Sequence, residues 1–319
     1  KKAFEIATAA SHFGNFNDIP TFSVLAKDKL SNNNSIIRES VGIKKLLEIL
    51  KQAESDLIKS NKSINSVPYN GLAEANIERL YINSEDAYRQ MQLTQASLYL
   101  YAKCQEKGRK PRSAGSLKTA YGITDLDINS CITESSNKVI SHLDYLPIKT
   151  DKYLVCFAPE AFLELITSFS SMFNARLILD GLSISNKESL GNSIAVPFLS
   201  IFDNALHKDN ICSFNFDGEA TPKRNLILVK DGIIENFLHS ESTARKFDVE
   251  PTGHASLGAK AGVSPEWIVI KKTNKSTCKM NSLSFQDTKE KFVLIDNLNA
   301  LHAGIKATQG SFSLPFDGW

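Results

Sequence analysis

The strongest restriction on the fold is a β-hairpin pattern in the second half of the chain. Two apolar runs, 226–229 and 233–238, are separated by Lys230-Asp231-Gly232. Asp-Gly supplies the positive φ that a tight primed turn requires, so the pattern predicts two antiparallel strands joined by a short turn. Runs 267–270 and 292–295 are rich in β-branched and aromatic residues and predict two further strands. We therefore expect a strand-rich second half.

Helical spacing of apolar residues marks three other stretches. Residues 41–60 place isoleucines and leucines on one side of a helix, among lysines and glutamates. Residues 127–143 follow the same pattern and are ended by Pro147. Pro159 suits the first position of a helix, where its missing N–H costs nothing, and the apolar residues within 162–173 fall on one helical face.

Shorter signals complete the prediction. Residues 82–103 fit both periods, and their tyrosines and alternating apolar residues favour strands. Asn70-Gly71 predicts a turn, and the basic stretch 108–115 predicts a loop. Residues 153–157 predict a buried strand, and residues 240–246 predict a short helix opened by a hydroxyl cap.

These elements predict an α+β fold in two unequal domains. The boundary is expected near 149–152, after Pro147 and before the run 153–157. Residues 1–148 would form an N-terminal α+β domain, and residues 149–319 a strand-rich C-terminal domain.

Charge and hydropathy restrict the class of protein. The 319 residues are 42% apolar and 23% charged, the balance of a chain that can bury a core. Lysine and arginine (37) nearly cancel aspartate and glutamate (35), leaving a net charge of +2. This balance gives no general attraction to phosphate backbones or anionic lipid, so direct nucleic-acid binding is not expected. No apolar run is long enough for a membrane span and no signal peptide is evident, so the predicted location is cytoplasmic.

The cysteines predict free thiols. Their number is odd and their spacing irregular, without a CxxC pair, which argues against a disulfide framework. Cys156, inside an apolar run, is the clearest predicted core thiol. The five are Cys104, Cys131, Cys156, Cys212 and Cys278.

The histidines exclude a helical zinc site. Two ligands one helical turn apart, as in HExxH, can reach the same ion. No two of the six histidines here lie closer than fifteen residues; they are His12, His142, His207, His239, His254 and His302. Two alternatives stay open: a metal site assembled from His239, His254 and Cys278, or an active site that joins His239 and His254 with an acid. The motifs GxSxG, SxxK, GxGxxG and the Walker loop are all absent.

Two segments contain polar residues that a purely structural role does not fully explain. Asp217 and Glu219 flank Gly218 just before the hairpin, and an acidic turn is their simplest local explanation. Arg224 and Arg245 have the fork geometry that clamps a carboxylate, from Asp217, from Glu219 or from a peptide terminus. An internal salt bridge is the simpler interpretation of either arginine.

Taken in order, these segments resemble the TldD/PmbA family, the so-called modulators of DNA gyrase. Six short runs carry the resemblance across about a hundred residues, which makes it specific. They are Phe216-Asp217-Gly218-Glu219-Ala220-Thr221-Pro222-Lys223-Arg224, Val229-Lys230-Asp231-Gly232, Ser242-Thr243-Ala244-Arg245-Lys246, Thr252-Gly253-His254-Ala255, Leu301-His302-Ala303-Gly304-Ile305 and Gly310-Ser311-Phe312-Ser313-Leu314-Pro315.

The resemblance implies a cytosolic protease made of two related subunits. The TldD type carries an HExxxH helix that binds zinc, and the PmbA or TldE type lacks it. The corresponding stretch here, 159–169, contains Glu164 but no histidine. The chain therefore resembles the PmbA type, with no catalytic or metal residues of its own and zinc expected on the partner.

The resemblance also supplies candidate residues for a peptide groove. They are Asp217, Gly218, Glu219, Arg224, Arg245, Thr252, Gly253 and His254. Two positions depart from the family pattern, Ala220 in place of glycine and His254 in place of asparagine. Ala220 argues against a positive φ at that position. Family chains also continue past Trp319, so the C-terminal end is interpreted as truncated.

The expected partners follow from the subunit type. They are an HExxxH-bearing TldD-type subunit in a heterodimer, or a second copy in a homodimer, together with unfolded peptide and without a membrane. The alternative function is a homodimeric interaction protein, similar to a DNA gyrase modulator, without protease activity.

Overall fold

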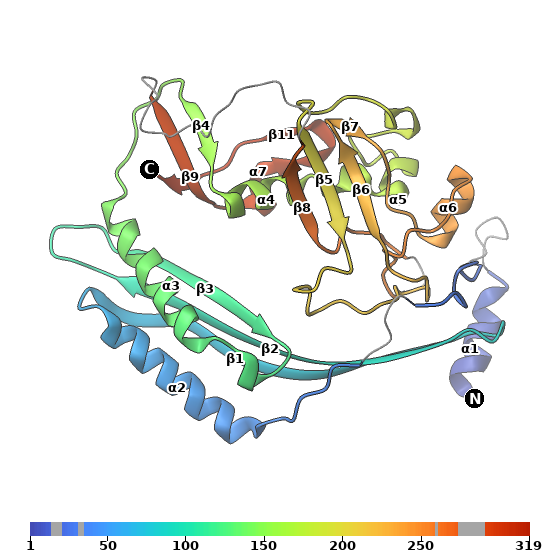
Figure 1. Cartoon of the computed structure of the whole chain (residues 1–319), viewed down its shortest axis with the longest axis horizontal. Helices are drawn as coiled ribbons and strands as arrows, with labels where there is room; N and C mark the ends of the chain where they lie inside the picture. The colour runs from blue at the N-terminus through green and yellow to red at the C-terminus, as the bar shows by residue number, and fades with distance from the viewer. Residues whose placement is uncertain (14–20, 31–34, 259–260, 274–290) are drawn as a thin grey trace.

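The computed structural model describes residues 1–13, 21–30, 35–258, 261–273 and 291–319. A long, curved three-stranded sheet carries two helices on one face, and two smaller sheets lie above it (Figure 1). The α+β prediction is confirmed. Within the described residues, no helix is long and apolar enough to cross a membrane.

The long sheet has the order β1-β2-β3 and is antiparallel throughout. Its strands are β1 (Ile64–Ile82), β2 (Tyr88–Cys104) and β3 (Arg112–Ala120). In β2, Leu98, Leu100, Ala102 and Cys104 alternate with more exposed residues and are fully buried. This period of two confirms strands rather than a helix in 82–103.

One sequence prediction fails in this sheet, and another is only partly correct. Asn70-Gly71 forms no turn but lies inside β1, where Gly71 pairs with Tyr99. The sequences flanking the pair do not pair with each other, because both pair with β2. Of the predicted loop 108–115, residues 108–111 do connect β2 to β3, but Gly115 lies in β3, opposite Tyr101. A Cβ there would lie 2.7 Å from the Cα of Tyr101, so the glycine permits close approach of two strands.

Helices α2 (Gly42–Ser60) and α3 (Ile128–Ser141) cover one face of the long sheet, as their periodicity predicts. Asp127 caps α3 by accepting the Ser130 N–H at 2.8 Å. Leu57, Cys131 and Val139 are fully buried in the shared core. Among the described residues, Cys104, Cys131, Cys156 and Cys212 are free thiols, and the first two are buried. Cys278 lies outside the described residues.

A second sheet has the order β12-β9-β4. Its strands are β4 (Leu154–Phe157), β9 (Phe292–Leu298) and β12 (Phe316–Gly318). Helix α4 (Pro159–Ser168) starts at its proline and packs Ala161 and Leu165 against β9. The strand predicted at 153–157 is confirmed as β4, but its predicted burial is wrong, because β4 ends the sheet and leaves Leu154 40% and Val155 47% exposed. Cys156 is accordingly only half-buried.

A third sheet has the order β7-β6-β5-β8. Its strands are β5 (Leu199–Asn204), β6 (Asn225–Lys230), β7 (Ile233–Ile234) and β8 (Ile268–Lys272). Asp231 and Gly232 have φ values of 49° and 81°, which confirms the predicted primed turn. Helix α6 (Glu241–Phe247) follows the hairpin. The remaining elements are α1 (Lys2–Ser11), α5 (Ala175–Leu179), α7 (Leu301–Gly304), β10 (Ile305–Lys306) and β11 (Ser311–Phe312).

Candidate functional site

The candidate residues lie in three segments that the fold brings together, 214–224, 239–245 and 251–256, here called the motif cluster. Asp217 is its centre and is 1% exposed. Oδ1 of Asp217 accepts the N–H groups of Glu219 at 2.9 Å and Thr221 at 3.0 Å, and Oδ2 accepts that of Ala255 at 2.9 Å. The acidic turn expected for this segment is therefore also a cross-link to the segment 251–256.

Asp217 is held as a structural carboxylate. Burial raises the pKa of Asp217, and the three backbone N–H groups oppose that rise. The N–H of Gly218 donates to the Ala255 carbonyl at 2.7 Å, in parallel with the Asp217 bond to Ala255. The carboxylate oxygens thus face backbone of their own chain rather than a solvent-filled groove.

The tip of the long hairpin docks on the same loop. Nη1 of Arg79 donates to the Phe216 carbonyl at 3.1 Å, and the Arg79 guanidinium lies 4.1 Å from the Phe214 ring centroid. Nε of Arg89 donates to the Ala220 carbonyl at 3.4 Å. The two arginines bring the end of the β1–β2 hairpin to the motif cluster.

The backbone conformation of Ala220 contradicts the sequence prediction. Its φ is +65°, although its identity argues against a positive φ at this position. An alanine in this conformation costs about 1–2 kcal/mol relative to a right-handed one. Its methyl group is fully buried against Ala26 and Ala87, and burying one such group recovers about 0.8 kcal/mol. Packing therefore offsets much of the strain.

Glu219, rather than a hydroxyl, caps helix α6. Ser240 occupies the N-cap position but makes no capping bond with its side chain, which corrects the predicted hydroxyl cap. Oε2 of Glu219 accepts the Glu241 N–H at 2.7 Å instead. A carboxylate from a distant loop thus satisfies a donor at the start of the helix.

Residues 21–30 are held by the same cluster. Oγ1 of Thr221 lies 2.7 Å from Oγ of Ser23, and both side chains are buried. The N–H of Val24 donates to Oε2 of Glu241 at 3.2 Å. The motif cluster therefore joins an N-terminal segment, the hairpin tip and helix α6.

Glu219 gives the cluster a pH dependence. Burial raises the pKa of Glu219 to about 7, with smaller contributions from the Asp217 and Glu241 carboxylates. The folded chain then holds a proton that the unfolded chain releases above its ordinary pKa of 4.5, so this group's contribution to stability falls as the pH rises from 4.5 to 7. We expect Glu219→Gln to stabilise the protein by about 2 kcal/mol at alkaline pH and to have little effect at acidic pH.

Urea unfolding of wild type and Glu219→Gln at about pH 5 and about pH 8 measures this difference. Comparing the two proteins at each pH cancels the titration of the other groups. An equal effect of the substitution at both pH values would contradict the assignment.

The two arginines form ion pairs inside the chain, but not with the expected acids. Nη1 of Arg224 lies 3.2 Å from Oε2 of Glu250, and its Nη2 donates to the Pro251 carbonyl at 3.1 Å. Nε of Arg245 lies 3.6 Å from Oε1 of Glu241, one turn earlier on α6. Both guanidinium groups remain partly exposed, so a second acceptor can approach either one.

A buried polar chain runs behind the cluster. Nδ1 of His254 lies 3.0 Å from Oγ1 of Thr252, and Nε2 of His254 lies 3.1 Å from Oδ2 of Asp203. Asp203, at the end of β5, also accepts the N–H groups of Glu266 and Trp267, each at 2.8 Å. Burial opposes ionisation of Asp203, but the His254 bond and these donors outweigh it and lower its pKa.

Thr252, His254 and Asp203 follow the hydroxyl, imidazole, carboxylate order of a nucleophilic triad. Unlike a catalytic triad, however, they are not accessible to a substrate. Thr252 is 4% exposed, and its hydroxyl also accepts the His239 N–H at 2.8 Å. The side chains of His254 and Asp203 are fully buried. A nucleophile must reach a substrate carbonyl, so this arrangement serves to hold β5 and the segments 251–256 and 266–267 together.

Gly253, between Thr252 and His254, has a φ of +79°. A Cβ at this position would overlap the Pro222 carbonyl and lie 2.9 Å from the Cα of Lys223. The glycine is therefore required where the two loops cross.

Sequence reasoning missed three buried charged residues of this region, Asp203, Glu241 and Lys223. Nζ of Lys223 lies 2.7 Å from Oε1 of Glu266, and burial lowers the pKa of Lys223. Lys223 and Glu241 lie in segments already singled out, whereas Asp203 does not; its sequence signal is that it ends a short apolar run. Asp203 and Lys223 have partners far away along the chain, His254 and Glu266, whereas Glu241 pairs with Arg245 on its own helix.

A metallopeptidase-type zinc site does not fit the described residues. Among them, no group of three or more His, Cys, Asp or Glu side chains is arranged to hold a metal ion. Helix α4 has no histidine, and Glu164 is exposed on it. The His239 ring packs 4.9 Å from that of Phe247, and burial lowers its pKa to about 4. The assembled site with Cys278 involves a position outside the described residues.

Two family models match most of this chain. The model for the PmbA/TldA metallopeptidase central domain matches residues 38–143, and that for the C-terminal domain matches residues 150–319. The chain therefore has the sequence of a metallopeptidase-type protein. It belongs to the PmbA/TldA metallopeptidase family.

Relatives of known sequence are similar over part of their length. A metalloprotease of Methanocaldococcus jannaschii is 24% identical over 183 residues, covering 56% of this chain and 40% of that protein. A Synechocystis metalloprotease is 34% identical over 88 residues, covering 28% of this chain and 19% of that protein. The match thus spans well under two thirds of these relatives.

Solved structures share the fold over most of this chain. A candidate modulator of a DNA gyrase from Thermotoga maritima has a TM-score of 0.76 and 26% identity, covering 92% of this chain and 68% of that one. TldE from Thermococcus kodakarensis has a TM-score of 0.69 and 16% identity, covering 94% and 67% respectively. The second likeness concerns the fold alone.

Proposed function

We propose that this chain is a PmbA/TldE-type subunit, without a zinc site of its own, of a metalloprotease that degrades unfolded peptides. The observation that carries the proposal is helix α4. At the position of the HExxxH helix of the TldD type, α4 carries Glu164 but no histidine. No metal-bound water is then available for that carboxylate to deprotonate. The zinc and the general base would then belong to an HExxxH-bearing partner subunit.

The hydrogen bonding of the motif cluster supports a scaffolding role. Asp217 and Asp203 are saturated by backbone donors, and His254 lies between Asp203 and Thr252. These side chains fix the loops between strands, so neither Asp217 nor Asp203 is free to act as a catalytic acid. Arg224 and Arg245, which are partly exposed, are the candidates for contact with a peptide carboxylate or carbonyl.

Sheet edges provide a way to hold an extended peptide. In the described residues, β8 and β4 each end their sheet and pair with one neighbour. Adding a strand to such an edge forms main-chain hydrogen bonds, which give affinity with little sequence preference. A groove of this kind suits unfolded clients of varied sequence.

The decisive experiment is co-expression with an HExxxH-bearing relative from the same genome. We expect the chain alone to retain no stoichiometric zinc and to cleave no unfolded peptide, because it lacks the ligand set. The purified pair should contain zinc and degrade casein-like unfolded substrate. Zinc content by elemental analysis and peptide release are the two measurements.

Two controls make the result specific. A partner with its motif glutamate changed to glutamine should bind this chain and zinc but lose peptide release, which places the chemistry on the partner. One tightly bound zinc per copy of this chain alone would overturn the proposal. Equal activity of the partner with and without this chain would also overturn it.

A further inference from the structure

Three tyrosines lie side by side on the face of the long sheet that α2 and α3 do not cover. The ring centroids of Tyr69 and Tyr101 are 6.0 Å apart, and those of Tyr99 and Tyr101 are 6.1 Å apart. In the described structure, Tyr69 is 66% and Tyr99 is 39% exposed. Leu117 of β3, paired with Tyr99, is 59% exposed beside them. The three rings, here called the tyrosine row, form an exposed patch of the kind that marks an interaction site.

The face that carries the tyrosine row lacks acidic residues around it. Side chains alternate between the two faces along a strand, so the odd-numbered positions of 95–103 and 113–119 share this face. None of them is an aspartate or a glutamate. Lys103 is the last of them in β2 and lies two residues, roughly 7 Å, beyond Tyr101.

A basic turn continues this face at the end of the sheet. Residues 103–112, from the end of β2 to the start of β3, contain five lysines and arginines and one glutamate. Nη1 of Arg109 lies 3.5 Å from that glutamate and 3.1 Å from Asp144. In the described part of the chain, the exposed Lys107 and Lys110 have no carboxylate within ion-pair distance. The turn between β2 and β3 projects beyond α2 and α3 (Figure 1).

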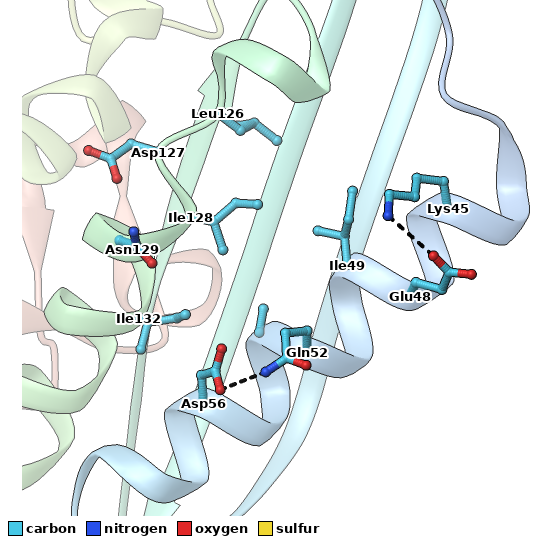
Figure 2. A pocket seen from close by; sticks show the side chains of 11 residues that line it. Lys45, Glu48, Ile49, Gln52, Asp56, Leu126, Asp127, Ile128, Asn129 and Ile132 are labelled. Atoms are coloured by element: carbon cyan, nitrogen blue, oxygen red, sulfur yellow. Dashed lines mark hydrogen bonds and ion pairs between the residues drawn. The ribbon is translucent and has the colours of Figure 1, made fainter.

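The side of the sheet that the helices cover has the opposite character. The groove between α2 and α3, about 570 Å³ in volume, is lined by Glu48, Asp56 and Asp127 (Figure 2). Lys45 of this groove is bonded to Glu48 at 3.3 Å. The long sheet thus separates an acidic groove from a face with exposed rings and unpaired lysines. The total charge of +2, from which no nucleic-acid binding is expected, conceals this separation.

Exposed rings beside unpaired lysines fit the chemistry of single-stranded nucleic acid. Each nucleotide presents a flat base, which stacks on an aromatic ring, and a phosphate, which attracts a lysine. A duplex presents only the edges of its bases in its grooves, so its bases are not free to stack on the rings. An acidic peptide would pair with the lysines but would leave the rings without a matching group.

We propose that the tyrosine row and the basic turn bind single-stranded nucleic acid. The bases lie on the three rings, and the phosphates lie along Lys103, Lys107 and Lys110. This binding is separate from the proposed role in peptide degradation and does not depend on a metal-bearing partner.

Fluorescence anisotropy of labelled oligo(dT) and oligo(rU), titrated with the full-length chain, tests the proposal. The oligonucleotides have about 12 nucleotides, within the usual site size of such surfaces. At about 0.15 M salt we expect a dissociation constant of about 1–100 µM, the range of sequence-independent binding. Binding of either oligonucleotide supports the proposal, and the ratio of the two dissociation constants distinguishes DNA from RNA.

Tyr99→Ala tests the contribution of the rings. Loss of one base stack should raise the dissociation constant for single strands about tenfold. Binding of a duplex of equal length should not change, because it does not use the ring. Tyr99→Phe keeps the ring and should bind as wild type does. Tyr88→Ala is the matched control, since Tyr88 is a 59% exposed tyrosine of the same strand outside the row, and should change the constant less than about threefold.

A variant with Lys107→Gln and Lys110→Gln tests the contribution of the turn. Each phosphate contact to a single strand contributes about 0.7 to the slope of log K against log salt concentration, so the slope should decrease by about 1.4. The matched control carries Lys44→Gln and Lys51→Gln, which remove two exposed lysines from α2, and should keep the wild-type slope.

Three results would overturn the proposal. The first is no binding of either oligonucleotide at about 100 µM chain, the weak end of sequence-independent binding. The second is unchanged single-strand binding by Tyr99→Ala, which would reduce the surface to a general anion site. The third is a polyglutamate peptide of equal length that displaces the oligonucleotide at equal concentration and is itself weakened by Tyr99→Ala, which would assign the surface to acidic peptides.

Discussion

Replacing Asp203 with alanine should lower the free energy of unfolding by about 4 kcal/mol, since removing one partner of a buried hydrogen-bonded pair leaves the others uncompensated. Asp203 is fully buried and accepts the Glu266 and Trp267 N–H groups at 2.8 Å each. Its loss also leaves Nε2 of the buried His254 without its acceptor. Urea unfolding monitored by tryptophan fluorescence and by circular dichroism measures the change.

A double-mutant cycle with His254→Ala separates the His254–Asp203 contact from the backbone bonds. The two substitutions should cost less together than the sum of the single ones, because each already removes the same contact. Asp209→Ala is the control, since Asp209 is an exposed acid in the adjoining loop. A loss below about 1 kcal/mol for Asp203→Ala would show that the chain of side chains contributes little to stability.

The fold was predictable where a local sequence pattern is compatible with only one secondary structure. Helices α2 and α3 and the Asp231-Gly232 turn follow from apolar spacing and from turn chemistry. Strand β1 was not predictable in this way. Its polar residues show no alternation, and it is a strand because β2 pairs with it along its length. The exposure of β4 likewise depends on its place at the edge of its sheet. Its amino-acid composition does not reveal that place.

The candidate site was predictable as a set of segments but not as a set of contacts. Asp217, Glu219, Thr252 and His254 do lie in one cluster. Glu219 reaches the N–H of a residue 22 positions away, and His254 reaches Asp203 across 51 positions. No local rule pairs residues at such separations. Arg245 is a different case, because it pairs with Glu241 one helical turn away rather than with the acids that the sequence singled out. Ala220 shows the same limit, because the residues that bury its methyl group, Ala26 and Ala87, lie far away along the chain.

The dense bonding of the motif cluster has a consequence for its role. Asp217, Glu219 and Thr221 each have a backbone or side-chain partner in their own chain, and the cluster joins the hairpin tip, residues 21–30 and α6. Changes in these residues should therefore be detected first as changes in stability and only secondarily in peptide handling. Stability and activity must be measured on the same variants to separate the two effects.

The second large effect is expected for Gly253→Ala, with a loss of about 3 kcal/mol or more. Two costs add at this position. A left-handed φ of +79° costs an alanine about 1–2 kcal/mol. The new methyl group would also overlap the Pro222 carbonyl, and overpacking of a rigid backbone costs about 1–3 kcal/mol. Thermal and urea unfolding of the variant measure the sum.

Gly71→Ala is the matched control for the same chemical change. Gly71 lies in β1, where an added methyl group would have no other atom within 4 Å and where φ is ordinary, so neither cost applies there. Alanine there also reduces the conformational freedom of the unfolded chain, so we expect stability to stay equal or rise by about 0.5 kcal/mol. If both variants lose the same stability, the loss would not be specific to the left-handed, crowded position of Gly253. A large loss confined to Gly253→Ala locates the constraint at the crossing of the Pro222 and Thr252 loops, on which the buried Asp203–His254 pair depends.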